Sequence, residues 1–123
     1  MIVGIGIDVV EPSRIRDKIN RLSFKKKIFS TNEIEYCEKQ KKKVQHYAAR
    51  FAAKEAFLKA TGMGLMAGYD LHEIEIVHSQ NGEPKLSVKG NFLKLKRKLK
   101  WERIHVSISH IESVACAIVI LEK

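Results

Sequence analysis

Residues 50–64 read RFAAKEAFLKATGMG, and this stretch decides how the rest of the chain is expected to fold. Alanine, phenylalanine and leucine dominate it and proline is absent, which predicts a helix; Gly62 and Gly64 are expected to end it. At about 100° per residue, Glu55 and Lys59 fall on one stripe that is otherwise made of alanine and phenylalanine. An exposed Glu–Lys pair is the ordinary explanation of this spacing, and a functional pair is the alternative.

The composition restricts the classes of function. With 123 residues, 45% of them hydrophobic, the chain can bury one small core, and we expect a single domain over residues 1–123. No run is long enough for a transmembrane helix, and the start, MIVGIGIDVV, is typical of a strand, so a cytoplasmic protein is expected. Cys37 and Cys116 show no metal-binding spacing and no disulfide framework. The formal net charge of +9 predicts an anionic partner: nucleic acid, an anionic membrane, a phosphorylated small molecule or an acidic protein.

Asp8 lies near the C-terminal end of an apolar, β-branched segment, residues 2–10, that we expect to form a strand. A carboxylate in such a place needs a partner, because burying an unpaired charge is costly. Two roles remain open for it. Asp8 caps the following helix, in which Pro12 takes an early position, or it binds a metal ion.

The helix that we expect over residues 12–22 carries a basic stripe formed by Arg14, Lys18 and Arg21. A solvated face is the ordinary explanation of such a stripe, and a docking face for an acidic helix is the alternative. The residues expected to face inward are Ile15, Ile19 and Leu22.

The remaining pattern predicts an α+β fold in which an antiparallel sheet packs against one long helix. Ser30 and Glu33 have the spacing of a capping box, and the long helix is expected to begin near Val44. After the glycines at 62, 64 and 68, alternation predicts a strand, Asn81-Gly82 predicts a hairpin, and residues 85–88 form its second strand. A helix over residues 91–99 and strands over 104–109 and 114–121 complete the chain. The residues that suggest the first hairpin strand are Leu71, Ile74, Ile76 and Val77.

Several side chains are candidates for phosphate chemistry. If Glu55 and Asp8 lie close together, they offer two of the hard oxygen ligands with which Mg²⁺ is held beside phosphates and water. Lys59, one turn after Glu55, would neutralise or protonate a leaving phosphate, and Arg50 and Lys54 would extend that positive surface. The strand end at residues 107–110, SISH, lacks the nucleophile elbow of a hydrolase.

Taken together, these segments resemble the holo-acyl-carrier-protein synthases, which are small 4′-phosphopantetheinyl transferases. The matching segments occur in the family's order over almost the whole chain, and the combination of KEA, GIGID and SISH is specific. They are GIGIDVVEPSRI from Gly4, FSTNE from Phe29, RFAAKEAFLKATGMG from Arg50, NGEP from Asn81, VSISH from Val106 and VACAIVILE from Val114. Pro12 and Met63 depart from the family's usual residues.

The resemblance implies the family's fold and a Mg²⁺-dependent reaction of fatty acid biosynthesis. In that reaction phosphopantetheine passes from coenzyme A to a serine of apo acyl carrier protein, and 3′,5′-ADP is released. Asp8 and Glu55 are implied to bind Mg²⁺ with the pyrophosphate of coenzyme A, and Lys59 to contact the phosphates. Whether Glu55, Asp8 or a metal-bound water accepts the serine proton stays open. The positions implied to line the coenzyme A site, with the basic ones near its 3′-phosphate, are Arg50, Gly82, Pro84, Ser109 and His110.

The resemblance also implies partners and assembly. Arg14, with Lys18 and Arg21, matches the helix that docks the acidic helix of the carrier protein. The family is typically a homotrimer with active sites between subunits, and neither nucleic acid nor a membrane is an implied partner. The main alternative, a basic nucleic-acid-binding module, rests on the charge alone, since the chain has no helix-turn-helix, zinc or RNP-type fingerprint. A catalytically inactive assembly subunit is a third hypothesis, and the intact set of Asp8, Glu55 and Lys59 argues against it.

Overall fold

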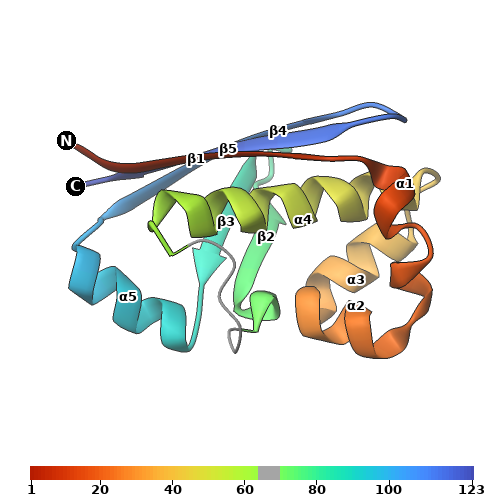
Figure 1. The fold of residues 1–123 in the computed structure, drawn as a ribbon, viewed down its shortest axis with the longest axis horizontal. Helices are drawn as coiled ribbons and strands as arrows, with labels where there is room; N and C mark the ends of the chain where they lie inside the picture. The colour runs from red at the N-terminus through yellow and green to blue at the C-terminus, as the bar shows by residue number, and fades with distance from the viewer. Residues whose placement is uncertain (64–69) are drawn as a thin grey trace.

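The computed structural model describes residues 1–63 and 70–123 of the chain (Figure 1). Its elements are, in order, β1 (Ile2–Val10), α1 (Pro12–Ile15), η1 (Lys18–Asn20), α2 (Leu22–Ile28), α3 (Thr31–Glu38), α4 (Lys43–Ala60), η2 (Leu71–Glu73), β2 (Ile74–His78), β3 (Pro84–Val88), α5 (Asn91–Leu99), β4 (Arg103–His110) and β5 (Ala115–Glu122).

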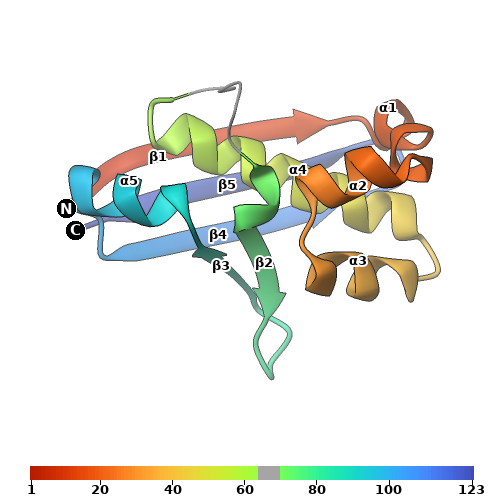
Figure 2. The ribbon, with the colours of Figure 1, turned by 90° about the horizontal axis from the view of Figure 1, so that it is seen from below.

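The strands form two antiparallel sheets instead of the single sheet that was expected. One sheet has the order β1-β5-β4, and the hairpin β2-β3 forms the other. The three-stranded sheet covers one side of α4 along its whole length, while α1, α2 and α3 gather near the start of α4 and α5 lies near its end (Figures 1 and 2). The α+β class, with antiparallel strands packed on one long helix, is confirmed.

Helix α4 is the centre of the core. It spans Lys43–Ala60 as predicted, and Gly62, at a positive φ of 79°, follows its end and donates from its backbone N–H to the carbonyl of Lys59 at 3.0 Å. Gly64 and Gly68 lie outside the described residues. The first half of α4 packs with Phe29 and the second half with aromatic residues that include Trp101. Among the described residues, no helix combines the length and the apolar character that a membrane span requires.

Two glycines allow β1 to lie directly on the backbone of α4. A Cβ atom added to Gly6 would lie 1.9 Å from the carbonyl oxygen of Ala56, and one added to Gly4 would lie 2.0 Å from that of Ala60. Because successive side chains of a strand alternate between its faces, this contact also directs Asp8 towards α4. The glycines therefore position a candidate functional carboxylate as well as packing the core.

We expect the substitution Gly6→Ala to lower the free energy of unfolding by about 3 kcal/mol, the upper end of the usual cost of overpacking. The carbonyl of Ala56 belongs to the backbone of a buried helix and is unable to move aside cheaply. Urea denaturation followed by circular dichroism measures the change. Leu93→Ala, at a side chain that is 42% exposed on α5, is the control, and equal losses in the two variants would contradict this packing argument.

The prediction of one helix over residues 12–22 is wrong. The chain instead forms α1, the turn η1 and α2, and the break lies at Arg21, whose backbone is extended with ψ 118° and serves as the N-cap of α2. Helix α2 was missed because it is short and lysine-rich, and its one apolar pair at helical spacing, Phe24 and Ile28, is only half-buried. Ile15 and Ile19 are buried as expected, whereas Leu22 is 61% exposed.

The hairpin is confirmed, with a changed start for each of its strands. β2 begins at Ile74, and Leu71 belongs to the turn η2, although its side chain is buried. Pro84 opens the second strand opposite His78, and Gly82 has the positive φ of 81° that a tight turn favours.

Candidate active site

Strand β1 and helix α4 bring together Asp8, Glu55 and Lys59. The ammonium of Lys59 donates to Oδ1 of Asp8 at 3.0 Å and to the carbonyl of Ile7 at 3.0 Å. Asp8 and Glu55 line one pocket of about 380 Å³. The helix-cap role for Asp8 is excluded, because the N-cap of α1 is Glu11 and its side chain makes no capping hydrogen bond.

Glu55 is a buried carboxylate that no donor satisfies fully. Its residue is 7% exposed, and among the described residues its Oε1 has no hydrogen-bond partner. Burial raises the pKa of Glu55, the negative charge of Asp8 raises it further, and Lys59 opposes the shift. A pair of carboxylates with an uncompensated oxygen fits a hard cation such as Mg²⁺. Since the described residues contain no group of three or more possible metal ligands, water and substrate oxygens would complete its coordination.

The basic residues that were predicted to dock a partner lie partly beside this pocket. Arg14 and Lys18 line it together with Asp8 and Glu55, whereas Arg21 is not among its lining residues. Arg14 is largely exposed and pairs with Glu11 at 3.2 Å. The stripe does not run along one helix, because α1 ends at Ile15.

A second pocket, of about 510 Å³, collects four of the five positions expected to line a coenzyme site: Arg50, Gly82, Pro84 and His110. The fifth, Ser109, does not line it. Side chains alternate along β4, so Ser109 points to the opposite face from His110 and is exposed there.

Among the residues of the second pocket that the sequence did not predict, three carry aromatic or imidazole rings: Tyr36, His46 and His78. Tyr36 stacks on the ring of His78, with centroids 4.9 Å apart, and lies 4.3 Å from the guanidinium carbon of Arg50. The i, i+4 spacing of His46 and Arg50 on α4 is the one clue that the sequence offered. Tyr36 and His78 come from α3 and β2, whose contact with α4 no local pattern predicts.

Comparisons with known proteins agree with these features. The model of the 4'-phosphopantetheinyl transferase superfamily matches residues 4–119. The chain belongs to this superfamily. The holo-[acyl-carrier-protein] synthase of Syntrophus aciditrophicus is 46% identical over 99% of the chain and 97% of that protein, and the one of Geobacter sulfurreducens is 42% identical over 100% and 99%.

Solved structures of such transferases share the fold. The crystal structure of the holo-[acyl-carrier-protein] synthase from Neisseria meningitidis matches with a TM-score of 0.89 and 33% identity over the whole of both chains. The synthase from Bacillus anthracis, solved in complex with CoA (3',5'-ADP), matches with a TM-score of 0.82 and 34% identity over 100% of this chain and 98% of that one.

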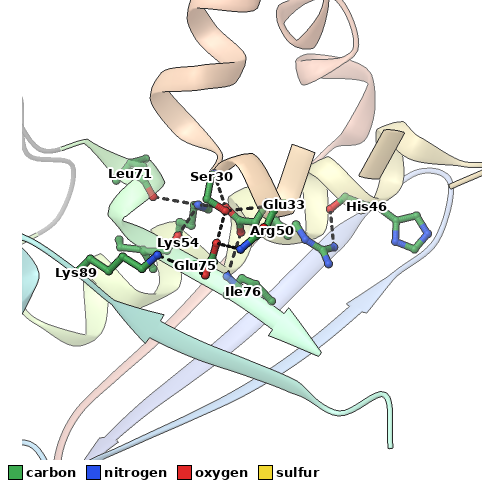
Figure 3. A network of polar contacts seen from close by, with 11 residues as sticks. Ser30, Glu33, His46, Arg50, Lys54, Leu71, Glu75, Ile76 and Lys89 are labelled. Atoms are coloured by element: carbon green, nitrogen blue, oxygen red, sulfur yellow. Dashed lines mark hydrogen bonds and ion pairs between the residues drawn. The ribbon is translucent and has the colours of Figure 1, made fainter. Parts of the chain in front are cut away.

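In this phosphopantetheinyl transferase Lys54 does not extend the positive surface, so that expectation is wrong. Its side chain is 0% exposed, and its ammonium donates to Oε1 of Glu33 at 2.6 Å and to the carbonyls of Leu71, at 3.0 Å, and Ile74 (Figure 3). Burial lowers the pKa of Lys54, and the charge of Glu33 acts in the opposite direction. All three ammonium protons are thus used inside the protein.

The capping box of α3 is part of the same buried network. As predicted, Ser30 accepts from the backbone N–H of Glu33 at 3.2 Å, and the Glu33 carboxylate accepts from the N–H of Ser30 at 2.9 Å. Glu33 also accepts from the N–H of Ile76 at 3.0 Å, and the Ser30 hydroxyl donates to Glu75 at 2.6 Å. This transferase therefore joins α3, α4 and β2, three elements that surround the Arg50 pocket, through one polar cluster (Figure 3).

Proposed function

We propose that this chain transfers 4′-phosphopantetheine from coenzyme A to a serine of apo acyl carrier protein in fatty acid biosynthesis, with Mg²⁺, and releases 3′,5′-ADP. It is a phosphopantetheinyl transferase whose full-length relatives are holo-[acyl-carrier-protein] synthases. The observation that carries the proposal is the pair of half-buried Asp8 and buried Glu55 beside the ammonium of Lys59.

Asp8 and Glu55 are the residues that would hold Mg²⁺, which when bound neutralises charge on the pyrophosphate of coenzyme A. Lys59 stands at the edge of the pair with its side chain half exposed, so its ammonium is accessible to a phosphate oxygen. By exchanging its bond to Asp8 for one to the departing 3′,5′-ADP, Lys59 would stabilise the leaving group. The orphaned oxygen of Glu55 supports the metal role, because a cation satisfies it directly.

The acidic recognition helix of the carrier protein is proposed to dock along Arg14 and Lys18. Both residues line the pocket of Asp8 and Glu55, so a partner held there presents its serine to the metal pair. The net charge of +9 supports rapid association with an acidic protein.

A homotrimer with active sites between subunits is part of the proposal. Two features support it. The side chains of β1 that point away from α4 are apolar and exposed, as an interface strand requires. Glu55 and Arg50 are five residues apart on α4, or about 140° around its axis, so the metal pair and the Arg50 pocket face different ways and are joined when subunits meet. The exposed apolar residues of β1 are Ile2, Val3, Ile5, Ile7 and Val9.

We expect Ile5→Asp to convert the assembly into monomers, because it places a charge in the apolar face that the subunits would bury. Analytical ultracentrifugation measures the change. Leu22→Asp is the matched control, since Leu22 is 61% exposed and Ile5 is 59% exposed, but Leu22 lies on α2, away from this face. A wild-type protein that sediments as a monomer would contradict the trimer.

We place the activity in the cytoplasm. Cys37 and Cys116 are free thiols, as expected of a protein that works in a reducing compartment.

The test of the function is the intact mass of an apo acyl carrier protein incubated with this chain, coenzyme A and Mg²⁺. A gain of one phosphopantetheine group that disappears in EDTA is the expected result. If no carrier protein gains mass while the chain is folded, the transferase proposal fails. Metal-independent binding to nucleic acid that weakens steeply with salt would then support the alternative.

A further inference from the structure

Three histidines surround Arg50, and two of them, His46 and His78, have no role in the proposed reaction. His46 lies one turn before Arg50 on α4, His78 ends β2, and His110 ends β4. The rings of His46 and His110 meet edge to face with centroids 5.0 Å apart, while His78 stacks on Tyr36. Imidazoles from three separate elements therefore converge on one guanidinium.

The guanidinium of Arg50 is a buried positive charge that no carboxylate of the described residues neutralises. Arg50 is 3% exposed, and its Nε has no hydrogen-bond partner there. Its other nitrogens donate to the carbonyl of His46 at 3.4 Å and to Nδ1 of His78 at 3.3 Å (Figure 3 shows the first). Because an uncompensated buried charge is costly, this pocket favours an anionic ligand.

The contact with Arg50 fixes the protonation state of His78. An arginine only donates hydrogen bonds, so Nδ1 of His78 must accept and carries no proton. His78 is exposed at the end of β2, and its partial desolvation and the charge of Arg50 both lower its pKa. Both observations give a neutral His78 near neutral pH in the free protein.

His46 is held neutral in the same way. Burial lowers its pKa, and the neighbouring charges of His110, Arg50 and His78 lower it further. The other titratable group at its ring is Tyr36, with centroids 5.8 Å apart. His110 is bonded through Nδ1 to the amide oxygen of Gln45 at 2.9 Å, which leaves its Nε2 available.

The family resemblance already implies that the basic residues of this pocket lie near the 3′-phosphate of coenzyme A. We propose that two further residues, His46 and His78, take up protons when this phosphate monoester binds beside Arg50. The inference rests on the proposed function, which makes coenzyme A the substrate. A phosphate dianion close to a neutral imidazole favours the imidazolium, which then donates a charge-assisted hydrogen bond to it.

The expected consequence is selectivity that depends on pH. Coenzyme A and 3′-dephospho-coenzyme A share the adenine, the pyrophosphate and the pantetheine arm, and only the first offers the monoester. The affinity of coenzyme A is expected to rise by up to about tenfold per pH unit for each proton taken up as the pH falls. The comparison is made above about pH 6, the second pKa of a phosphate monoester, so that the ligand remains a dianion.

Calorimetric titration of the Mg²⁺-loaded protein tests the proposal. Coenzyme A and its 3′-dephospho analogue are titrated in two buffers of different ionisation enthalpy, which gives the number of protons taken up per ligand. We expect net proton uptake with coenzyme A and none with the analogue. Equal uptake with both ligands would overturn the inference, because the protons would then not belong to the 3′-phosphate.

Substitutions of single histidines identify the residues that take up the protons. His46→Gln and His78→Gln are each expected to reduce the uptake, and the double variant to abolish it and to flatten the pH dependence of affinity. His72→Gln, at an exposed histidine whose nearest ionic partner is Asp70, is the matched control and should leave the uptake unchanged. Uptake that persists in the double variant would overturn the inference alone. If neither ligand binds the wild-type protein, the proposed function fails as well.

Discussion

Replacing Glu55 with glutamine is expected to remove metal-dependent transfer and to stabilise the metal-free protein. The amide keeps the size of the carboxylate but loses the charge that Mg²⁺ requires. We expect the rate of phosphopantetheine transfer to fall roughly a hundred- to a thousandfold, which is typical when one electrostatic contact to a phosphoryl-type transition state is lost. Intact-mass analysis of the carrier protein at fixed times measures the rate.

The substitution is expected to raise the stability of the metal-free protein, because a negative charge on buried Glu55 destabilises the fold when no metal is bound. Burial, with Asp8 nearby, raises its pKa in the folded state. The proton bound at Glu55 therefore stabilises the fold at low pH, and this contribution is lost as the pH rises through the raised pKa. In EDTA at neutral pH the glutamine variant should unfold at a higher temperature than the wild type, and the difference should shrink as the pH falls.

The control for both measurements is Glu35→Gln, at an exposed carboxylate that pairs with Lys39 at 3.3 Å. It should change neither the rate nor the unfolding temperature appreciably. If Glu55→Gln keeps the wild-type rate, Glu55 is not a metal ligand. If the variant is less stable than the wild type in EDTA, the uncompensated carboxylate is not the source of strain that the structure indicates.

The elements that the sequence predicted well are those specified by neighbouring residues. Helix α4 follows from its own composition, the start of α3 from Ser30 and Glu33, and the β2-β3 turn from Asn81 and Gly82. Asp8 was placed at a strand end by the apolar, β-branched composition of residues 2–10, and its proximity to α4 was considered only as a condition before the family resemblance implied it. Interactions between residues that are close in the sequence were sufficient to predict the helix, its capping box and the turn.

The features that the sequence did not predict depend on contacts between distant segments. The split into two sheets results from the pairing of β1 with β5, which lie at opposite ends of the chain. Lys54 appeared to belong to a basic surface, because its partner Glu33 lies 21 positions away and its other acceptors are backbone carbonyls. Strand pairing and buried ion pairs of this kind leave no periodic pattern to detect.

That buried pair gives the largest expected loss of stability. Replacing Lys54 with methionine keeps an unbranched side chain of similar length but leaves the charge of Glu33 buried with no cation beside it. Removing one partner of such a pair typically costs about 3–5 kcal/mol, so we expect a loss of this size in the free energy of unfolding. Urea denaturation measures it, and the loss should be accompanied by faster hydrogen exchange at Ile76, whose N–H is bonded to Glu33.

A double-mutant cycle distinguishes a charge effect from a packing effect. Glu33→Gln alone should also destabilise the protein, because the amide is unable to accept from Lys54, Ser30 and Ile76 together. In the double variant Lys54→Met/Glu33→Gln no charge is left unpaired, so its loss should be smaller than the sum of the two single losses. Additive losses would mean that methionine destabilises by poor packing alone. Because the network joins α3, α4 and β2 around Arg50, the single variant Lys54→Met should also weaken coenzyme A binding, although Lys54 lines neither the Arg50 pocket nor the pocket of Asp8 and Glu55.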